Sequence, residues 1–194
     1  MGAMQRRVFI LGAVAAAWLR ATRTDYENAV RKFDGIQQYR FKAGSRVPIS
    51  LAELNAYVQT ELPEYVPAGV RNPRIELGAN NTATGYAQID FVKLRSAQGK
   101  PPGWLLRKLL QGERDVSVTC EVRSANGVVT VYPTEVEIEG VPISGAALDF
   151  LIHNYLLPNY PNAKIAQPIR LKYGMDRFEV YDSRVDIVLK NRLR

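Results

Sequence analysis

The stretch that decides the fold is VSVTCEVRSANGVVTVYPTEVEI, residues 116–138. Apolar and polar side chains alternate through its first half, which is the pattern of a β-strand with one buried face. Ala125-Asn126-Gly127 has the composition of a tight turn, so a hairpin is expected there. In the second half the apolar positions change from odd to even numbers across Pro133, which predicts a bulge or a sharp bend. The returning strand is therefore expected to be curved, or to lie at a sheet edge.

Other segments also alternate and predict further strands. Arg74 to Ala79 and Tyr86 to Leu94 flank the turn-forming residues 80–85 and predict a second hairpin. Strands are further expected within residues 163–173, 177–181 and 185–189, the last two joined at Asp182-Ser183. The sheet is therefore expected to be antiparallel.

Two main helices are predicted, and each follows a Val-Pro-Ile-Ser sequence. The first begins with the capping box Ser50-Leu51-Ala52-Glu53 and is expected to end at Leu62, before Pro63. The second is expected to run from a cap at Ser144 to Leu157, and an earlier helix is expected over residues 25–38. Amphipathic helices and six or more antiparallel strands must bury their apolar faces against each other, which predicts an α+β domain.

The cysteine and histidine content argues against most catalytic and metal chemistry. The chain has one cysteine, Cys120, and one histidine, His153, so an intramolecular disulfide, a zinc–thiolate cluster and a two-histidine site are excluded. Cys120 alternates with valines and is expected to act as a small buried hydrophobe. No metal, no cofactor and no catalytic residue is expected. The remaining enzymatic alternative is a hydrolase that uses His153 as its base, but helix capping already explains Ser144, the hydroxyl nearby.

The positive charge is concentrated at the beginning of the chain. Residues 1–24 carry +4 of the net charge of +7 and contain no acidic residue. The remaining 170 residues are therefore barely basic and lack the dense Lys/Arg face typical of nucleic-acid binding, so no nucleic-acid partner is expected.

Residues 1–24 have the order of an export signal. Arg6-Arg7 precedes the twelve-residue apolar run Val8 to Leu19, which is too short to span a bilayer. The paired arginines resemble part of a twin-arginine signal. We therefore expect an export signal or N-terminal membrane anchor over 1–24 and one domain over 25–194, in the periplasm or at a membrane. The alternative is an ordinary buried first helix.

Three features follow one another along the chain: the segment Ile49-Ser50-Leu51-Ala52-Glu53-Leu54-Asn55-Ala56-Tyr57-Val58, the hairpins after it, and the Gly140-Val141-Pro142-Ile143 approach to a second helix. Together they resemble the small bacterial members of the tubular lipid-binding (TULIP) superfamily. The resemblance covers roughly residues 40–190. It implies an exported protein whose long curved antiparallel sheet wraps around amphipathic helices and leaves an apolar tunnel for acyl chains. The chain lacks the lipid-attachment cysteine after the signal.

With this resemblance, the expected function is non-enzymatic binding or transport of a lipid or other apolar small molecule in the cell envelope. The alternative from another class is a structural adaptor that binds a protein partner through an apolar patch. The expected ligand-binding residues are apolar positions on the predicted strands and helices: Leu54, Val58, Ile89, Phe91, Val118, Val131, Leu148, Leu151, Ile152 and Tyr155.

A second expected site is a membrane contact in the helical segment 103–111. Its contact residues are expected to be Trp104, Leu105, Arg107 and Lys108, because an aromatic ring and cations suit the headgroup region of anionic lipid. The alternative is a core helix with two solvated cations.

Overall fold

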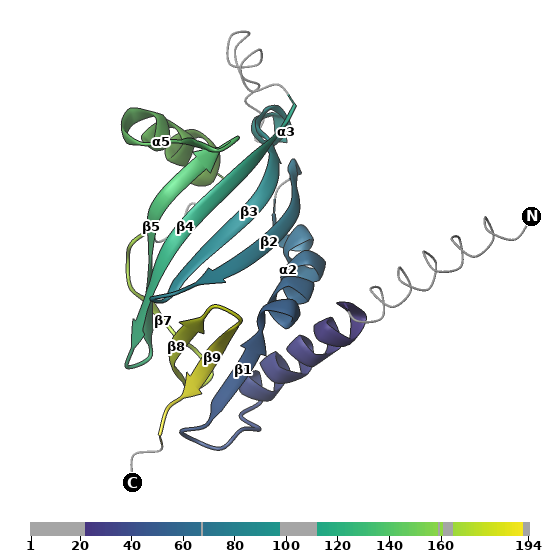
Figure 1. The fold of residues 1–194 in the computed structure, drawn as a ribbon, viewed down its shortest axis with the longest axis vertical. Coiled ribbons are helices and arrows are strands. Elements are labelled where there is room, and N and C mark those ends of the chain that lie inside the picture. The colour runs from purple at the N-terminus through teal and green to yellow at the C-terminus, as the bar shows by residue number, and fades with distance from the viewer. Residues whose placement is uncertain (1–21, 67, 98–111, 159, 161–164, 192–194) are drawn as a thin grey trace, which may run out of the picture.

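The computed structural model describes residues 22–66, 68–97, 112–158, 160 and 165–191. It has the predicted α+β architecture with a large antiparallel sheet (Figure 1). Six strands form that sheet: β2 (Val70–Gly78), β3 (Thr82–Asp90), β4 (Glu113–Ala125), β5 (Val128–Ile138), β6 (Val141–Pro142) and β7 (Ile169–Arg170). The first four pair in chain order, and both β6 and β7 pair with β5, so the sheet remains open.

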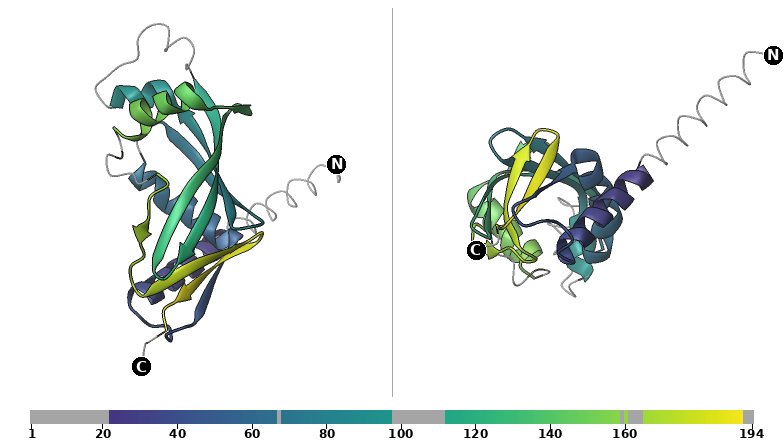
Figure 2. Two further views of the ribbon diagram at one scale, coloured as in Figure 1. Left: turned by 90° about the vertical axis from the view of Figure 1, so that its left-hand side faces the viewer. Right: turned by 90° about the horizontal axis from the view of Figure 1, so that it is seen from below.

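A smaller sheet lies at one end of the molecule. Its strand order is β1-β9-β8, with β1 at Arg46–Ser50, β8 at Met175–Tyr181 and β9 at Arg184–Leu189. The hairpin turn at Asp182-Ser183 is confirmed. Residues 22–37 form a helix, and α2 (Leu51–Tyr65) follows β1 directly. Figure 2 shows these helices on one side of the long axis and the six-stranded sheet on the other.

The hairpin of β4 and β5 confirms the bulge predicted at Pro133. Pro133 lies opposite Cys120 and Glu135 lies opposite Thr119, so Thr134 is the extra residue. The turn is tight because Asn126 and Gly127 both adopt left-handed backbone conformations, with φ of 53° and 77°. The bulge keeps the valines before and after Pro133 on the same face of the sheet.

The predicted capping box at the start of α2 is confirmed. The Glu53 N–H donates to Ser50 Oγ at 3.1 Å, and the Ser50 N–H donates to Glu53 Oε2 at 2.8 Å. The predicted end at Leu62 was wrong, because α2 continues through Pro63 to Tyr65. A proline in the last turn removes one backbone hydrogen bond, and the Val66 N–H still bonds to Leu62 O at 3.1 Å.

One other predicted boundary was also wrong. The strand predicted to reach Leu94 ends at Asp90, whose carboxylate accepts the Lys93 N–H at 2.9 Å and so caps α3 (Phe91–Ala97). Phe91, the first residue of α3, is buried in the core.

Ser144 precedes α5 (Gly145–Leu151) as expected, but its side chain makes no capping hydrogen bond. A π-helical turn, Ile152–Leu156, continues α5.

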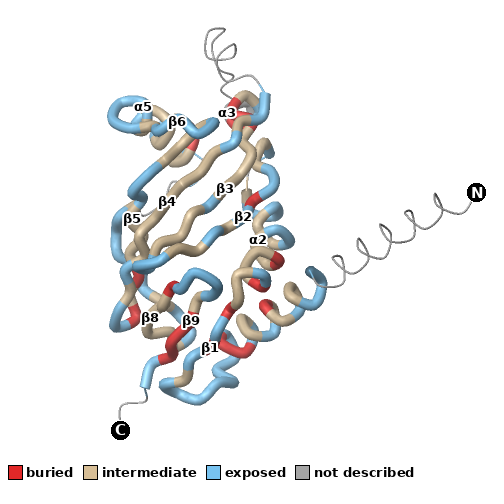
Figure 3. Tube along the Cα trace, viewed as in Figure 1, coloured by how far each residue is buried: buried red, intermediate tan, exposed pale blue. Residues whose placement is uncertain are grey.

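Buried side chains gather at the two ends of the molecule. One cluster, which we call the lower core, contains Ile36, Val47, Ile49, Ile187 and Leu189. The other, the upper core, contains Phe91, Leu94 and Tyr155. Between these cores most of β2 to β5 is only half-buried, and Figure 3 shows that stretch in tan and pale blue. Among the described residues, no helix has both the length and the apolar composition needed to cross a bilayer.

Candidate functional site

One face of the six-stranded sheet is apolar along most of its length. The strand register places Ile75, Gly85, Val118 and Val136 in one row across four strands. The next row contains Leu77, Ala83, Cys120 and Pro133. Alternation then puts the following side chains on this apolar face: Ile75, Leu77, Ala83, Ala87, Ile89, Val116, Val118, Cys120, Val122, Val129, Val131, Val136 and Ile138.

The upper core covers one end of the apolar face. Three residues near the ends of neighbouring strands, Ile89, Val116 and Ile138, pack against the upper core. The Phe91 and Tyr155 rings meet edge to face with centroids 5.2 Å apart. The helical turns after β3 and β6 therefore close this end.

Strand β8 covers the other end. Ser124 lies on the apolar face of β4, and its Oγ donates to Phe178 O at 2.9 Å and accepts the Phe178 N–H at 2.8 Å. Asn81, from the turn between β2 and β3, accepts the Val180 N–H on its Oδ1 at 3.0 Å. These side chains bind the edge of β8 across the end of the larger sheet, and Phe178 packs against the lower core.

The middle of the apolar face is only half-buried. It consists of Val118, Cys120, Val122, Val131 and Val136. Burial raises the pKa of the Cys120 thiol, which is typical of a thiol in apolar surroundings. A run of apolar side chains with covered ends and a half-buried middle has the chemistry to contact an elongated apolar molecule.

The predicted ligand-binding residues fall into several groups. The upper core brings Ile89, Phe91, Leu151 and Tyr155 together, although Phe91 and Tyr155 are buried by each other. Val118 and Val131 lie on the middle of the apolar face. Leu54 packs on the lower core instead. The other three are half-buried and lie on helices: Val58, Leu148 and Ile152.

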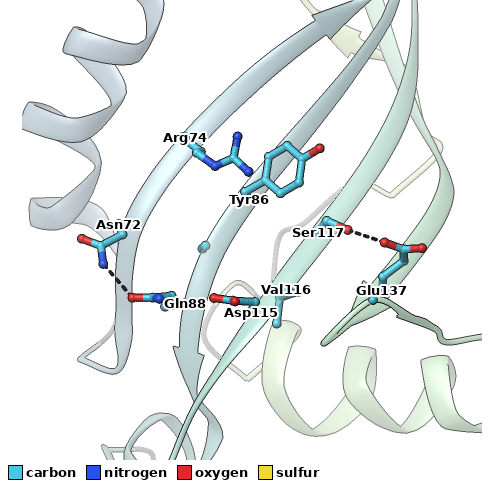
Figure 4. Close-up of a pocket in the computed structure, with 10 residues that line it drawn as sticks. Asn72, Arg74, Tyr86, Gln88, Asp115, Val116, Ser117 and Glu137 are labelled. Carbon is cyan, nitrogen blue, oxygen red and sulfur yellow. Dashed lines mark hydrogen bonds between the residues drawn. The ribbon is translucent and has the colours of Figure 1, made fainter.

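The opposite face of the same sheet carries a polar depression of about 460 Å³. Figure 4 shows Arg74 over the ring of Tyr86, 3.8 Å from its centroid. Asn72 Nδ2 donates to Gln88 Oε1 at 2.6 Å, and Ser117 Oγ donates to Glu137 at 3.2 Å. Hydrogen bonds from Arg74 and from Tyr86 hold the pKa of Glu76, beside the depression, below its ordinary value. The polar groups mainly bond to one another, as on a solvated sheet face.

The groups considered for chemistry are not brought together. His153 is exposed, and its Nδ1 contacts the backbone oxygen of Asp149 at 2.8 Å, four residues earlier in the same helix. Within the described ranges, no three His, Cys, Asp or Glu side chains converge as they would around a metal ion. The expected export segment 1–24 lies almost entirely outside the described residues. So do Trp104, Leu105, Arg107 and Lys108.

The polar residues that join the elements were not predicted from the sequence. Asn55, within α2, donates to Ile75 O at 2.8 Å and accepts the Ile75 N–H at 2.7 Å, so its amide completes the edge of β2. Ser124 and Asn81 do the same for β8. An asparagine inside an apolar helix stripe could have signalled Asn55. A single serine on the apolar face of a strand could have signalled Ser124.

Neither family models, nor curated proteins, nor solved structures match this chain in sequence or fold. The function is therefore inferred from the apolar and polar faces of the six-stranded sheet and from the upper and lower cores.

Proposed function

We propose that the chain binds the acyl chain of a lipid, or a similarly elongated apolar molecule, along the apolar face of its six-stranded sheet. The observation that carries the proposal is the half-buried middle of this face, between ends covered by the upper core and by β8. The resemblance to tubular lipid-binding proteins and the expected export signal support an envelope carrier or sensor without catalytic activity.

The dimensions and energetics of the face suit such a ligand. From Val116 to Val122 the strand advances about 20 Å, comparable to an extended long-chain acyl group. Each methylene group removed from water contributes roughly 0.8 kcal/mol. Because the side chains in the middle are already half-buried and held by strand pairing, ordering them around a ligand costs little entropy.

The single cysteine provides a direct test, because Cys120 lies in the middle of the proposed site. Oleate added to lipid-extracted full-length protein should slow alkylation of Cys120 by a small maleimide. The matched control is the double variant Thr119→Cys with Cys120→Ser, which moves the thiol to the opposite face of the same strand. Alkylation of this variant should not change with oleate.

A second arm asks whether the purified protein carries a ligand. Native mass spectrometry and solvent extraction should recover an apolar molecule from the wild type. They should recover much less from Val118→Phe, which fills the middle of the face. No recovered molecule, together with unchanged Cys120 alkylation in oleate, would contradict the proposal and favour a protein-binding adaptor. A measured hydrolytic turnover that is lost in His153→Ala would instead indicate an enzyme.

A further inference from the structure

Three exposed aromatic side chains gather at the lower end of the molecule. Tyr39, Phe41 and Tyr173 are 70%, 37% and 41% exposed. They come from two segments far apart in the sequence, residues 38–44 and 170–174. The segments meet where the Tyr39 ring lies 3.5 Å from the position that a Cβ on Gly174 would occupy. We call these two segments, together with Lys190, the tip.

The tip is also cationic. Its cations are Arg40, Lys42, Arg170, Lys172 and Lys190, and its two segments contain no acidic residue. In the part of the chain that the structure describes, no ion pair joins these cations to a carboxylate. By contrast, Arg46 and Arg177 in the adjoining sheet both pair with Glu179. The charge of the tip therefore remains available to a partner.

The aromatic residues surround a hollow. A cavity of about 260 Å³ is lined by Tyr39, Phe41 and Tyr173. A second cavity of about 250 Å³, lined by Phe33, Tyr57 and Phe178, shares Ile36 and Tyr173 with the first. The exposed apolar surface of the tip thus continues inward to the lower core.

Tyr39 is exposed at a cost in backbone strain. It follows the helix over 22–37 at the C′ position, where glycine is the most common residue. The Tyr39 N–H bonds to Ile36 O, the Arg40 N–H bonds to Gly35 O, and Tyr39 has a φ of 54°. A tyrosine in this left-handed conformation is an outlier, and such outliers gather at functional sites. The sequence has a large exposed ring at a position that glycine would occupy without strain.

We propose that the tip docks on a membrane surface that contains anionic lipid. Tyrosine and phenylalanine rings suit the headgroup and upper acyl regions, and five unneutralised cations suit an anionic leaflet. Binding of a nucleic acid would explain the cations, but it would not explain the apolar cavity behind the aromatic rings. The proposal stands on the tip alone and does not require a ligand on the apolar face.

Vesicle flotation of the full-length chain tests the charge. Arg40→Glu with Lys42→Glu should weaken binding to phosphatidylcholine vesicles containing phosphatidylglycerol by at least about tenfold at low salt. The difference should shrink above about 0.5 M salt, where exposed charges are screened over a few ångströms. The matched control is Arg71→Glu with Lys93→Glu, which reverses two exposed cations outside the tip and should weaken binding far less. Residues 1–24 are present in every variant, so their contribution cancels.

Tyr39→Gly separates docking from folding. This substitution should raise Tm by about 2–4 °C, because glycine adopts a φ of 54° without strain. It should nevertheless weaken vesicle binding severalfold. Tyr65→Ser, which removes an equally exposed tyrosine from α2, should leave vesicle binding unchanged.

Two results would overturn the proposal. One is vesicle binding by the tip variants equal to that of the wild type. The other is loss of binding to a single-stranded oligonucleotide with vesicle binding intact, which would assign the tip to nucleic acid. Alkylation of Cys120 in the presence of soluble oleate should be the same in the tip variants and the wild type. The docking proposal and the ligand proposal can therefore fail separately.

Discussion

Glu53 connects three segments through one carboxylate. It is 6% exposed, it completes the capping box of α2, and it accepts Lys32 Nζ on both oxygens at 2.7–2.8 Å. Lys32 also donates to Pro48 O at 2.7 Å. Pro48 lies on the edge strand β1, where a proline leaves no unpaired backbone N–H. One ion pair therefore holds the helix over 22–37, β1 and α2 together.

We expect Glu53→Gln to lower the free energy of unfolding by about 1–3 kcal/mol at pH 7, because it leaves Lys32 without a carboxylate at a mostly buried site. Burial raises the pKa of Glu53, but hydrogen bonds from Lys32 and Ser50 lower it by more, so the net pKa is below the ordinary 4.5. A depressed pKa stabilises the fold above the unfolded-state value, and this contribution is lost as pH falls through the folded-state value. Urea unfolding from pH 7 to pH 3 should therefore show the two proteins converging below about pH 4.5. A constant difference over this range would contradict the assignment.

At the scale of elements, the β4–β5 hairpin was predicted almost completely, because its signals are local. The alternation, the Asn-Gly turn and the parity change at Pro133 each act within a few residues. Phe91 was predicted to lie in a strand because it continues the alternation of apolar residues. In the structure the Asp90 side chain caps a helix that begins at Phe91. The ends of the candidate site were not predictable in this way. They depend on Ser124 meeting Phe178 and on Ile89 meeting Phe91 and Tyr155, which chain topology decides.

The hairpin turn gives a test at this scale. Gly127→Ala should lower the free energy of unfolding by about 1–2 kcal/mol, since φ at Gly127 is 77° and an added methyl group would also displace Lys190. Asn126→Gly is the control and should cost little, because glycine accepts the left-handed conformation of Asn126. Denaturant midpoints of the two variants provide the comparison. Equal midpoints would mean that the turn does not need its glycine.

At the scale of the whole molecule, two side chains and a backbone hydrogen bond at the β4–β5 turn join the two sheets. Ser124 satisfies both backbone groups of Phe178, Asn81 satisfies Val180, and the Gly127 N–H bonds to Asp176 O at 2.8 Å. These bonds also cover the exposed edge of β8, which would otherwise be open to pairing with another chain.

Ser124→Ala should therefore cost about 1–3 kcal/mol of stability, because it leaves the Phe178 N–H and C=O without partners. It should also speed hydrogen exchange at the amides of Phe178 and Val180 relative to those of β9. Ser117→Ala removes a comparable hydroxyl from the polar face, where Glu137 can bond to water, and should cost less than about 0.5 kcal/mol. If the two variants were equally stable, the junction would not depend on Ser124.

The pairing of β1 with β9 has a consequence for the order of folding. Ile49 and Val185 are direct partners although more than 130 residues separate them in the chain. Closing so long a loop carries a large entropic cost, and contacts of this kind usually form late. The β2–β5 hairpins can form while the chain is still being synthesised, but the lower core must wait for Leu189. A nascent chain therefore passes through a stage in which the larger sheet is paired and its lower end is still uncovered, and it is then most open to chaperones and most prone to aggregation.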